Sequence, residues 1–253
     1  MIRAEKILKT FGEQQVLKGI DFLFEAGKNN LIIGRSGAGK TVLLKILVGL
    51  QVPSSGIVWY DDVNFTALGK EGMRAIRMKI GMLFQGSALF DSLTVEENIR
   101  FPLDMFTPMT LKEKVERVNY CLERVNLGGN NKKYPSELSG GMQKRVGIAR
   151  AIVLNPKYLF CDEPNSGLDP KTAIMIDELI SSITEENNIT TVINTHDMNS
   201  VMEIGDNICF LHEGCLEWSG TKEQVLASDN ENLQSFIFAS PFLQKLRKSA
   251  LGK

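Results

Sequence analysis

The segment GRSGAGKT, at positions 34–41, constrains the fold of this chain more than any other stretch of it. It follows a short apolar run, residues 31–33, which is typical of a buried parallel strand. After Lys40, apolar side chains recur at helical spacing, at Val42, Leu43, Ile46, Leu47 and Leu50. A strand, a glycine-rich turn and a helix are the context that the G-x4-GK-[ST] pattern requires. The segment therefore predicts an α/β fold with a phosphate-binding loop.

The loop supplies both backbone and side-chain groups for a nucleotide. Its glycines let the backbone wrap around phosphates with the N–H groups pointing inward, and the following helix adds its positive N-terminal end. We expect Lys40 to neutralise the β- and γ-phosphates, and the Thr41 hydroxyl to bind Mg²⁺. The residues expected to contact ATP here are Gly34, Arg35, Ser36, Gly37, Ala38, Gly39, Lys40, Thr41 and Val42.

Two later apolar runs end in polar residues that fit the same site. Residues 158–161 lead into Asp162 and Glu163. A carboxylate at the end of a buried strand beside a phosphate loop can hold Mg²⁺ directly or through water, and Glu163 can orient or deprotonate the attacking water. A solvated acidic turn is the alternative for this pair alone. Residues 189–194 lead to His196, which we expect at the ligand-binding edge of a parallel sheet, within reach of a γ-phosphate.

The segment LSGGMQKR, at positions 138–145, predicts a second anion site. Ser139 is a natural helix N-cap, and the glycines after it leave N–H groups free at the positive end of the helix. Taken alone, Ser-Gly-Gly fits an ordinary capped helix equally well. The helix is expected to bury Val146, Ala149, Ile152 and Val153.

From residue 2 to about 227, these motifs occur in the order, and at roughly the spacing, of ABC-transporter ATPase subunits, which the chain resembles. The resemblance implies an α/β P-loop NTPase fold of the ABC ATPase type, with a RecA-like core and an inserted helical subdomain at about 86–155. We expect one domain over 1–227 and a helical tail over 228–253. In this family two copies pack head to tail, and each ATP lies between one phosphate loop and the partner's signature segment, here 138–145.

The resemblance also assigns roles residue by residue. Asp169 would help join the two ATP sites, and His196 would sense the γ-phosphate. Phe11 would stack on the adenine, and Gln85 would contribute to the Mg²⁺ site and link it to the helical subdomain. The residues implied to contact the partner's ATP are Ser139, Gly140, Gly141 and Gln143. The chain departs from the family at Val42, where most relatives have Ser or Thr; the backbone N–H remains, but a hydroxyl contact is lost.

Capping and periodicity predict three helices outside these motifs. Thr94 with Glu97 and Thr110 with Glu113 each fit a capping box. The helix after Thr110 should bury one apolar stripe: Leu111, Val115, Val118, Leu122 and Val125. Asp169 can cap another helix, with Pro170 in its first turn, that carries Ile174, Leu179, Ile180 and Ile183 inward. Residues 208–220 predict a hairpin.

Composition bounds the possible partners. A net charge of −1 over 253 residues gives no electrostatic case for nucleic-acid binding. The N-terminus is too charged for a signal peptide, and no apolar run approaches the roughly 18–20 residues that span a bilayer. The cysteines show no metal-binding spacing. We therefore expect a protein at the cytoplasmic face of the bacterial inner membrane, held there by a permease that is another polypeptide.

The segment after Gln85 resembles one particular group within this family. Leu89, Phe90, Leu93 and Val95 lie where the family docks a short helix of its membrane subunit. Residues 83–99, with the FPL that follows and GKTVLLK at 39–45, resemble the ATPases of Mce-type phospholipid transport systems, the Mla-like group. The implied partners are a permease and an Mce-domain lipid-binding protein, and the implied cargo is phospholipid moving between inner and outer membranes. An importer of another cargo, such as amino acids, and a soluble ABC ATPase stay open.

The C-terminal residues predict one or two short amphipathic helices, interrupted at 240–241. Their apolar side chains are Leu233, Phe236, Ile237, Phe242, Leu243 and Leu246. We expect this tail to pack on its own core; a second hypothesis is that it reaches the partner subunit and steadies the dimer.

Overall fold

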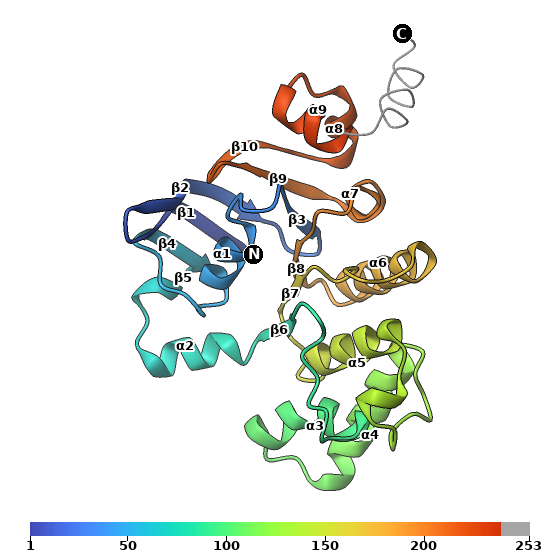
Figure 1. Cartoon of the computed structure of the whole chain (residues 1–253). Helices are drawn as coiled ribbons and strands as arrows, with labels where there is room; N and C mark the ends of the chain where they lie inside the picture. Colours follow the sequence, from blue (N-terminus) through green and yellow to red (C-terminus); the bar gives the residue numbers. More distant parts are fainter. Residues whose placement is uncertain (239–253) are drawn as a thin grey trace.

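The computed structural model describes residues 1–238, which form two β-sheets and the helices around them (Figure 1). The strands are β1 (Ile2–Phe11), β2 (Gln14–Phe24), β3 (Asn29–Ile33), β4 (Ser55–Tyr60), β5 (Val63–Asn64), β6 (Ile80–Leu83), β7 (Tyr158–Asp162), β8 (Thr190–Asn194), β9 (Asn207–His212) and β10 (Cys215–Gly220). The α-helices are α1 (Lys40–Leu47), α2 (Lys70–Arg77), α3 (Val95–Phe106), α4 (Leu111–Arg124), α5 (Gly140–Ile152), α6 (Pro170–Glu186), α7 (Met198–Ile204), α8 (Lys222–Ala227) and α9 (Glu231–Ile237). Two 3₁₀ turns are η1 (Phe65–Ala67) and η2 (Pro135–Glu137).

The strand order within these residues brings distant motifs together. The larger sheet runs β10-β9-β3-β8-β7-β6, and the smaller runs β2-β1-β4-β5. All neighbours in the larger sheet are parallel except β10 with β9, which form the predicted hairpin. Asn194 at the end of β8 is in register with Asp162 of β7 and with Ile32 of β3. The carboxyl ends of β3, β7 and β8 therefore meet at one edge, with the phosphate loop, Glu163 and His196 just beyond them.

Side chains of the larger sheet alternate between two cores, as the period of a strand requires. Leu31 and Ile33 of β3 face the core that contains residues of α3 to α9. Ile32 faces the other core, which contains α1 and the smaller sheet. Both faces of the sheet are thus covered, and β3, β7 and β8 are buried along their whole length. This burial on both faces is why residues 31–33, 158–161 and 192–193 are apolar without alternation.

The predicted helix starts are confirmed. Thr94 and Thr110 each form a capping box with the glutamate three residues later. Ser139 caps α5 by accepting a hydrogen bond from the Met142 backbone N–H, and the predicted apolar face of that helix is buried. Asp169 caps α6 in the same way, with Pro170 in the first position. These caps therefore fix the residues at which α3, α4, α5 and α6 begin.

Two apolar residues that were expected to face inward are exposed. Leu111 is 64% exposed and Ile174 is 46% exposed. Leu111 is the first residue of α4, one turn before the buried part of its apolar stripe. Ile174 lies about 200° around α6 from buried Ile176, because an α-helix turns about 100° per residue. The predictions for these positions were wrong.

The C-terminal helices pack on the larger core. Val225 of α8 and Leu233 of α9 are fully buried there, and Ile237 is 3% exposed. Packing of the tail on its own core is thus confirmed as far as residue 238. Phe242, Leu243 and Leu246 lie outside the described residues, so contact with a partner stays a prediction. None of the helices within residues 1–238 combines the length and the apolar character that crossing a bilayer requires.

Candidate active site

The phosphate loop owes its shape to glycine. Gly34, Gly37 and Gly39 have φ angles of 147°, 82° and 101°, in the region that side chains with a Cβ rarely adopt. A Cβ on Gly34 would also lie 2.2 Å from the backbone oxygen of Leu211 on β9. The loop is therefore pressed against the neighbouring strand, and its conformation is fixed before a ligand arrives.

Lys40 is held at the centre of this loop. Its Nζ donates hydrogen bonds to the backbone oxygens of Gly34, at 2.8 Å, and Arg35, at 3.2 Å. The residue is 8% exposed. Burial lowers the pKa of the ammonium, and the charges of Glu163 and Asp162 oppose that effect. Two carbonyls are weak counterparts for a buried cation, so an anion entering the loop would be strongly attracted to it.

Thr41, Asp162 and Asn194 form a connected group of oxygen and amide side chains. The Asn194 Nδ2 donates to the Thr41 Oγ1 at 3.3 Å and to the Asp162 Oδ1. The buried Asn194 Oδ1 has no hydrogen-bond partner among the described residues. One hydroxyl and one carboxylate side by side suit Mg²⁺, which takes few protein ligands and completes its shell with water and phosphate oxygens. Residues 1–238 contain no cluster of three or more His, Cys, Asp or Glu that could hold a metal alone.

Glu163 and His196 form a pair at the same edge. The His196 Nδ1 lies 2.8 Å from the Glu163 Oε2. Glu163 has a φ of 51°, and its backbone N–H donates to the Asn194 oxygen at 2.9 Å. The backbone oxygen of Glu163 accepts a hydrogen bond from the Nζ of buried Lys144 at 3.3 Å. Neighbours thus hold a rarely adopted backbone conformation that directs the carboxylate toward the pocket.

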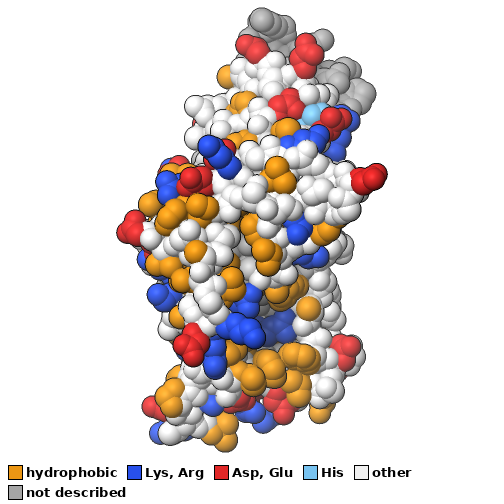
Figure 2. All heavy atoms as spheres, turned by 90° about the vertical axis from the view of Figure 1, so that its left-hand side faces the viewer, with side chains coloured by type: hydrophobic (Ala, Val, Ile, Leu, Met, Phe, Trp, Pro, Cys, Tyr) orange, Lys and Arg blue, Asp and Glu red, His pale blue; other side chains and the backbone are white. Residues whose placement is uncertain are grey.

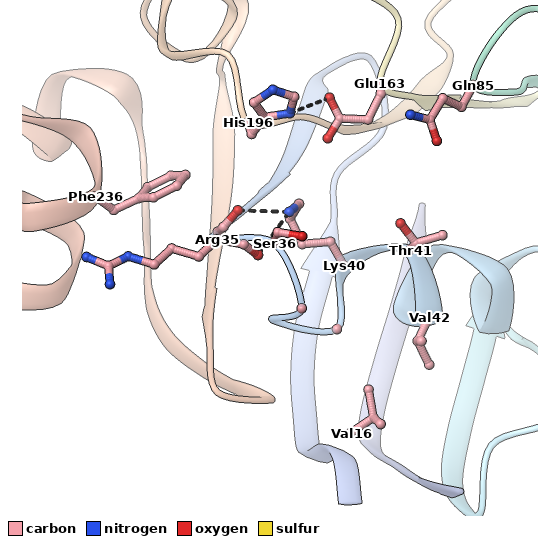
Figure 3. A pocket seen from close by; sticks show the side chains of 13 residues that line it. Val16, Arg35, Ser36, Lys40, Thr41, Val42, Gln85, Glu163, His196 and Phe236 are labelled. Carbon is pink, nitrogen blue, oxygen red and sulfur yellow. Dashed lines mark hydrogen bonds and ion pairs between the residues drawn. The ribbon is translucent and has the colours of Figure 1, made fainter. Parts of the chain in front are cut away.

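These groups line a pocket of about 710 Å³, a volume within the range of small-molecule sites. Figure 3 shows Glu163, His196 and Gln85 along one side of it and the phosphate loop along the other. The full lining is Val16, Gly34, Arg35, Ser36, Gly37, Gly39, Lys40, Thr41, Val42, Gln85, Glu163, His196 and Phe236. Eleven of these are residues predicted from sequence. Val16 and Phe236 were missed, because neither belongs to a motif and only the fold brings them here.

Three of the residues predicted to bind ATP or Mg²⁺ within the same subunit do not line this pocket. Ala38 is 6% exposed and packs into the smaller core. Asp162 is 8% exposed and lies behind Thr41, joined to it through Asn194. Phe11 ends β1 at the hairpin with β2; its ring is 43% exposed and lies 4.9 Å from the Lys9 Nζ.

The signature segment lies on a separate pocket of about 230 Å³. A Cβ on Gly141 would lie 2.6 Å from the Thr172 Cγ2, so α5 and α6 approach closely here. The Gln143 side chain donates to the backbone oxygens of Pro135 and Leu138, at 2.9 and 3.3 Å. The lining is Ser139, Gly140, Gly141, Arg145, Gly167, Leu168, Asp169, Thr172, Met175 and Ile176. None of these residues lines the phosphate pocket.

A buried polar chain ties the loop after Glu163 to the helix after His196. The Asn165 Nδ2 donates to the Ser200 Oγ at 2.9 Å, and that hydroxyl donates to the Asp177 Oδ2 at 2.8 Å. Burial raises the pKa of Asp177 to about 6, although the hydrogen bonds from Ser200 and Asn165 oppose the shift. No sequence motif predicted this series of hydrogen bonds, because its residues come from a loop, α6 and α7.

A family model described as ABC transporter matches residues 17–166, more than half of the chain. The chain belongs to this family. The matched range contains the phosphate loop, Gln85, the signature segment, Asp162 and Glu163. The chain is the ATP-binding, ATP-hydrolysing subunit of an ABC transporter.

Two curated relatives span nearly the whole chain. Identity to the methionine import ATP-binding protein MetN of Caulobacter vibrioides is 40% over 227 residues, which are 89% of this chain and 68% of that protein. Identity to the probable ribonucleotide transport ATP-binding protein mkl of Mycobacterium leprae is 36% over 236 residues, which are 93% of this chain and 68% of that protein. Both relatives are therefore longer than the ABC ATPase subunit described here.

Solved structures confirm the predicted ABC ATPase fold. The dimeric structure of the bacterial ABC transporter cassette MJ0796 is 34% identical, with a TM-score of 0.80 over 88% of this chain and 99% of that one. The same cassette is known in a dimeric post-hydrolysis state bound to ADP and Pi. The cbiO1 structure from Clostridium perfringens, part of the cbiONQ transporter complex, is 28% identical, with a TM-score of 0.84 over 99% of this chain and 98% of that one.

Proposed function

We propose that two copies of this subunit close head to tail around two ATP molecules, hydrolyse them and drive a membrane permease. One observation carries the dimer: the phosphate pocket and the signature pocket share no lining residue within one chain. A second copy would supply Ser139, Gly140, Gly141 and Asp169 to the γ-phosphate side of the first. The dimeric MJ0796 cassette, which is 34% identical, supports this arrangement. We keep 1–227 as the ATPase domain and 228–253 as its tail.

Each side chain of the phosphate pocket then has a task. Lys40 exchanges its two carbonyl contacts for β- and γ-phosphate oxygens, and the loop N–H groups bind the remaining charge. Thr41, Asp162 and Gln85 would hold Mg²⁺, which supplies charge neutralisation of the phosphates. Phe11 stays the proposed adenine contact, with Val16 and Val42 forming the apolar part of the pocket beside it.

Glu163 is the proposed general base. A water attacks the γ-phosphorus, its oxygen forms the new bond, and the bond to the bridging oxygen of ADP breaks. Glu163 accepts the proton of that water as the bond forms. His196, 2.8 Å from the Glu163 carboxylate, holds it in position and faces the γ-phosphate from the same edge. The products are ADP and phosphate, and their departure removes the contacts that keep the dimer closed.

An apolar groove fits the proposed contact with the permease. It has a volume of about 660 Å³ and lies between α2 and α3. In Figure 2, hydrophobic side chains gather with Lys and Arg side chains on the lower half of this face. The groove includes Phe84, Phe90, Phe101, Phe106 and Arg74. Val95, expected to share this contact, is fully buried and cannot reach a partner, so that part of the prediction was wrong.

A charge in the groove tests the permease contact. Phe90 is 44% exposed and its ring packs 5.0 Å from that of Phe101. Phe90→Glu should release the subunit from detergent-solubilised membranes while its ATP affinity stays unchanged. The matched control is Met105→Glu. Met105, on α3, is exposed like Phe90, but it does not line the groove. Equal retention of both variants on the membranes would refute the groove as the docking site.

For the cargo, we propose phospholipid moved by an Mce-type system. The support is the resemblance of residues 83–99, FPL and GKTVLLK to ATPases of that group. The second candidate is an amino-acid importer, favoured by 40% identity to MetN. The localisation proposed with either is the cytoplasmic face of the bacterial inner membrane.

Purification of the tagged full chain from native membranes in mild detergent separates these candidates. A permease recovered with an Mce-domain protein and bound phospholipid supports lipid transport. A permease with a soluble substrate-binding protein instead would support an amino-acid importer. Recovery from the soluble fraction alone would refute the transporter partners.

A further inference from the structure

The C-terminal helix α9 lies against the phosphate pocket although it belongs to none of the family's motifs. Its position is well fixed: Leu233 and Ile237 are buried in the larger core, and Asn230 caps the helix by accepting from the Leu233 N–H at 2.7 Å. The Gln234 Nε2 adds bonds to the backbone oxygens of Val225 and Ser228, at 3.1 and 2.8 Å. These contacts determine which side chains of α9 face the pocket.

Two consecutive residues of α9 meet the site. The Arg35 Nη2 of the phosphate loop donates to the Ser235 Oγ at 3.2 Å, across 200 positions of sequence. Ser235 in turn donates to the Asn232 oxygen at 3.0 Å. The next side chain, Phe236, lines the pocket and packs 5.5 Å from the ring of buried Phe210 on β9. The helix therefore touches both the loop and the space that the loop surrounds.

Figure 3 locates this contact within the pocket. Phe236 and Arg35 lie toward His196, whereas Val16 and Val42 lie on the opposite side of the phosphate loop. If Lys40, Glu163 and His196 bind the γ-phosphate, as the proposed function has it, then Phe236 forms a wall at the γ-phosphate end. An apolar ring there excludes water from one side of the phosphate, which strengthens the electrostatic attraction across the pocket.

Arg35 is a suitable link between nucleotide and helix. Among the described residues it has no carboxylate within ion-pair distance, and its guanidinium donates to a neutral hydroxyl, that of Ser235. The guanidinium has several donors in one plane, so it can keep its hydrogen bond to Ser235 while another N–H reaches an anion in the pocket. A phosphate that orders Arg35 would order its bond to α9 as well.

We propose that α9 is a nucleotide-responsive wall of the ATP site: Phe236 covers the γ-phosphate end, and the Arg35–Ser235 bond couples docking of the helix to ATP binding. Because coupling is reciprocal, ATP holds α9 in place, and loosening α9 weakens ATP binding by the same factor. Any partner that displaced or clamped α9 would then tune the affinity of the subunit for ATP.

Hydrogen–deuterium exchange tests the first half of the proposal. In the wild-type full chain, a non-hydrolysable ATP analogue with Mg²⁺ should slow amide exchange over 231–237. The comparison state is the same chain with Mg²⁺ alone. Unchanged or faster exchange in that segment, with the phosphate loop itself protected, would overturn the coupling. Absence of protection at the loop would instead count against the nucleotide site.

Equilibrium binding of the same analogue tests the second half. Phe236→Ala should weaken binding about fivefold or more, within the range of typical coupling between sites. Ser235→Ala should weaken it about two- to threefold, because it removes one weak neutral hydrogen bond. Phe236→Leu should restore most of the affinity, because it keeps an apolar wall. The matched control is Asn232→Ala on the same helix, whose side chain bonds Glu217 and not the pocket. It should bind like wild type.

Ser235→Ala also guards against simple unfolding of α9, because it removes one hydroxyl and leaves the buried face of the helix unchanged. Its thermal unfolding without nucleotide should match that of Asn232→Ala. Wild-type affinity in both Phe236→Ala and Ser235→Ala would refute the wall, and equal losses in all three variants would show a merely structural helix.

Discussion

The two pockets that we propose form the ATP site of the closed dimer are built in contrasting ways. The phosphate pocket gathers ionisable side chains at the ends of buried strands, with Lys40, Asp162 and Glu163 linked through Asn194 and the loop backbone. The signature pocket presents a helix start, a serine hydroxyl and glycine backbone on α5, packed against α6, and its ionisable side chains are Arg145 and Asp169. From this contrast we expect binding strength and bond cleavage to depend on the phosphate pocket, and the signature pocket to dock against it and complete it.

Glu163→Gln should have the largest effect on ATP turnover. The amide keeps the size of the carboxylate but cannot take a proton from water, so turnover should fall by about 10²–10⁴-fold. ATP should still bind, and the dimer should accumulate in its ATP-bound form. Phosphate release assays and size-exclusion chromatography with ATP measure the two outcomes. Turnover at the wild-type rate would remove Glu163 from the proposed mechanism.

Lys40→Ala should weaken ATP binding itself. Loss of one charge-assisted contact with the phosphates corresponds to about 2–3 kcal/mol, or roughly a 30- to 150-fold rise in Kd. Titration calorimetry on the full chain measures this change. An unchanged Kd would contradict the phosphate pocket as described.

Ser139→Ala should separate docking from binding. The change removes the N-cap of α5 and the hydroxyl that would meet the partner's γ-phosphate, so turnover should fall about tenfold while the Kd for ATP changes little. Thr110→Ala is the matched control: Thr110 caps α4 with the same backbone angles, φ −65° and ψ 159° for both residues, away from either pocket. Equal turnover in the two variants would mean that only the cap matters.

Asp177→Asn should have the smallest effect on turnover and a clear effect on stability. The folded-state pKa of Asp177 is about 6, above the ordinary 3.8, so the folded chain loses stability as pH rises from about 4 to about 6. Above about pH 6 the buried carboxylate is ionised, and its removal should raise the free energy of unfolding by up to about 3 kcal/mol.

Asn at this position still accepts the Ser200 hydrogen bond, so the polar contact between α6 and α7 should survive. Chemical unfolding at about pH 7.5 and about pH 4.5 should show a clearly larger stability gain at the higher pH. A gain that does not depend on pH would show that the carboxylate charge is not its cause. Asp197 and Glu203 lie close enough to raise the same pKa, and they stay unchanged in this comparison.

Local chemistry explains which parts of this molecule could be predicted from sequence. Glycine spacing gave the phosphate loop, and the capping residues Thr94, Thr110, Ser139 and Asp169 gave four helix starts, because each depends on residues a few positions apart. The outward positions of Leu111 and Ile174 were missed, since apolar side chains do not reveal which part of a helix meets its neighbours.

Contacts between distant segments account for what the sequence could not predict at the site. Asn194 bridges Thr41 and Asp162, and Phe236 reaches the pocket from α9, yet neither has a spacing that marks it. Their roles follow from strand order and from the packing of the C-terminal helices. The burial of Val95 has the same origin, because α3 turns that side chain into the core, whereas Phe90 lies exposed in the loop before α3.

The strand order has a consequence for synthesis on the ribosome. β3, which carries the phosphate loop, pairs on its two sides with β8 and β9, and Asn30 lies beside Asn207. The loop therefore emerges before both strands that flank β3, and it lacks them until residues 190–212 have been made. Such long-range pairing is slow to form, and an unpaired apolar strand is prone to aggregate. For this subunit, the ability to bind ATP would itself report that β8 and β9 have joined the sheet.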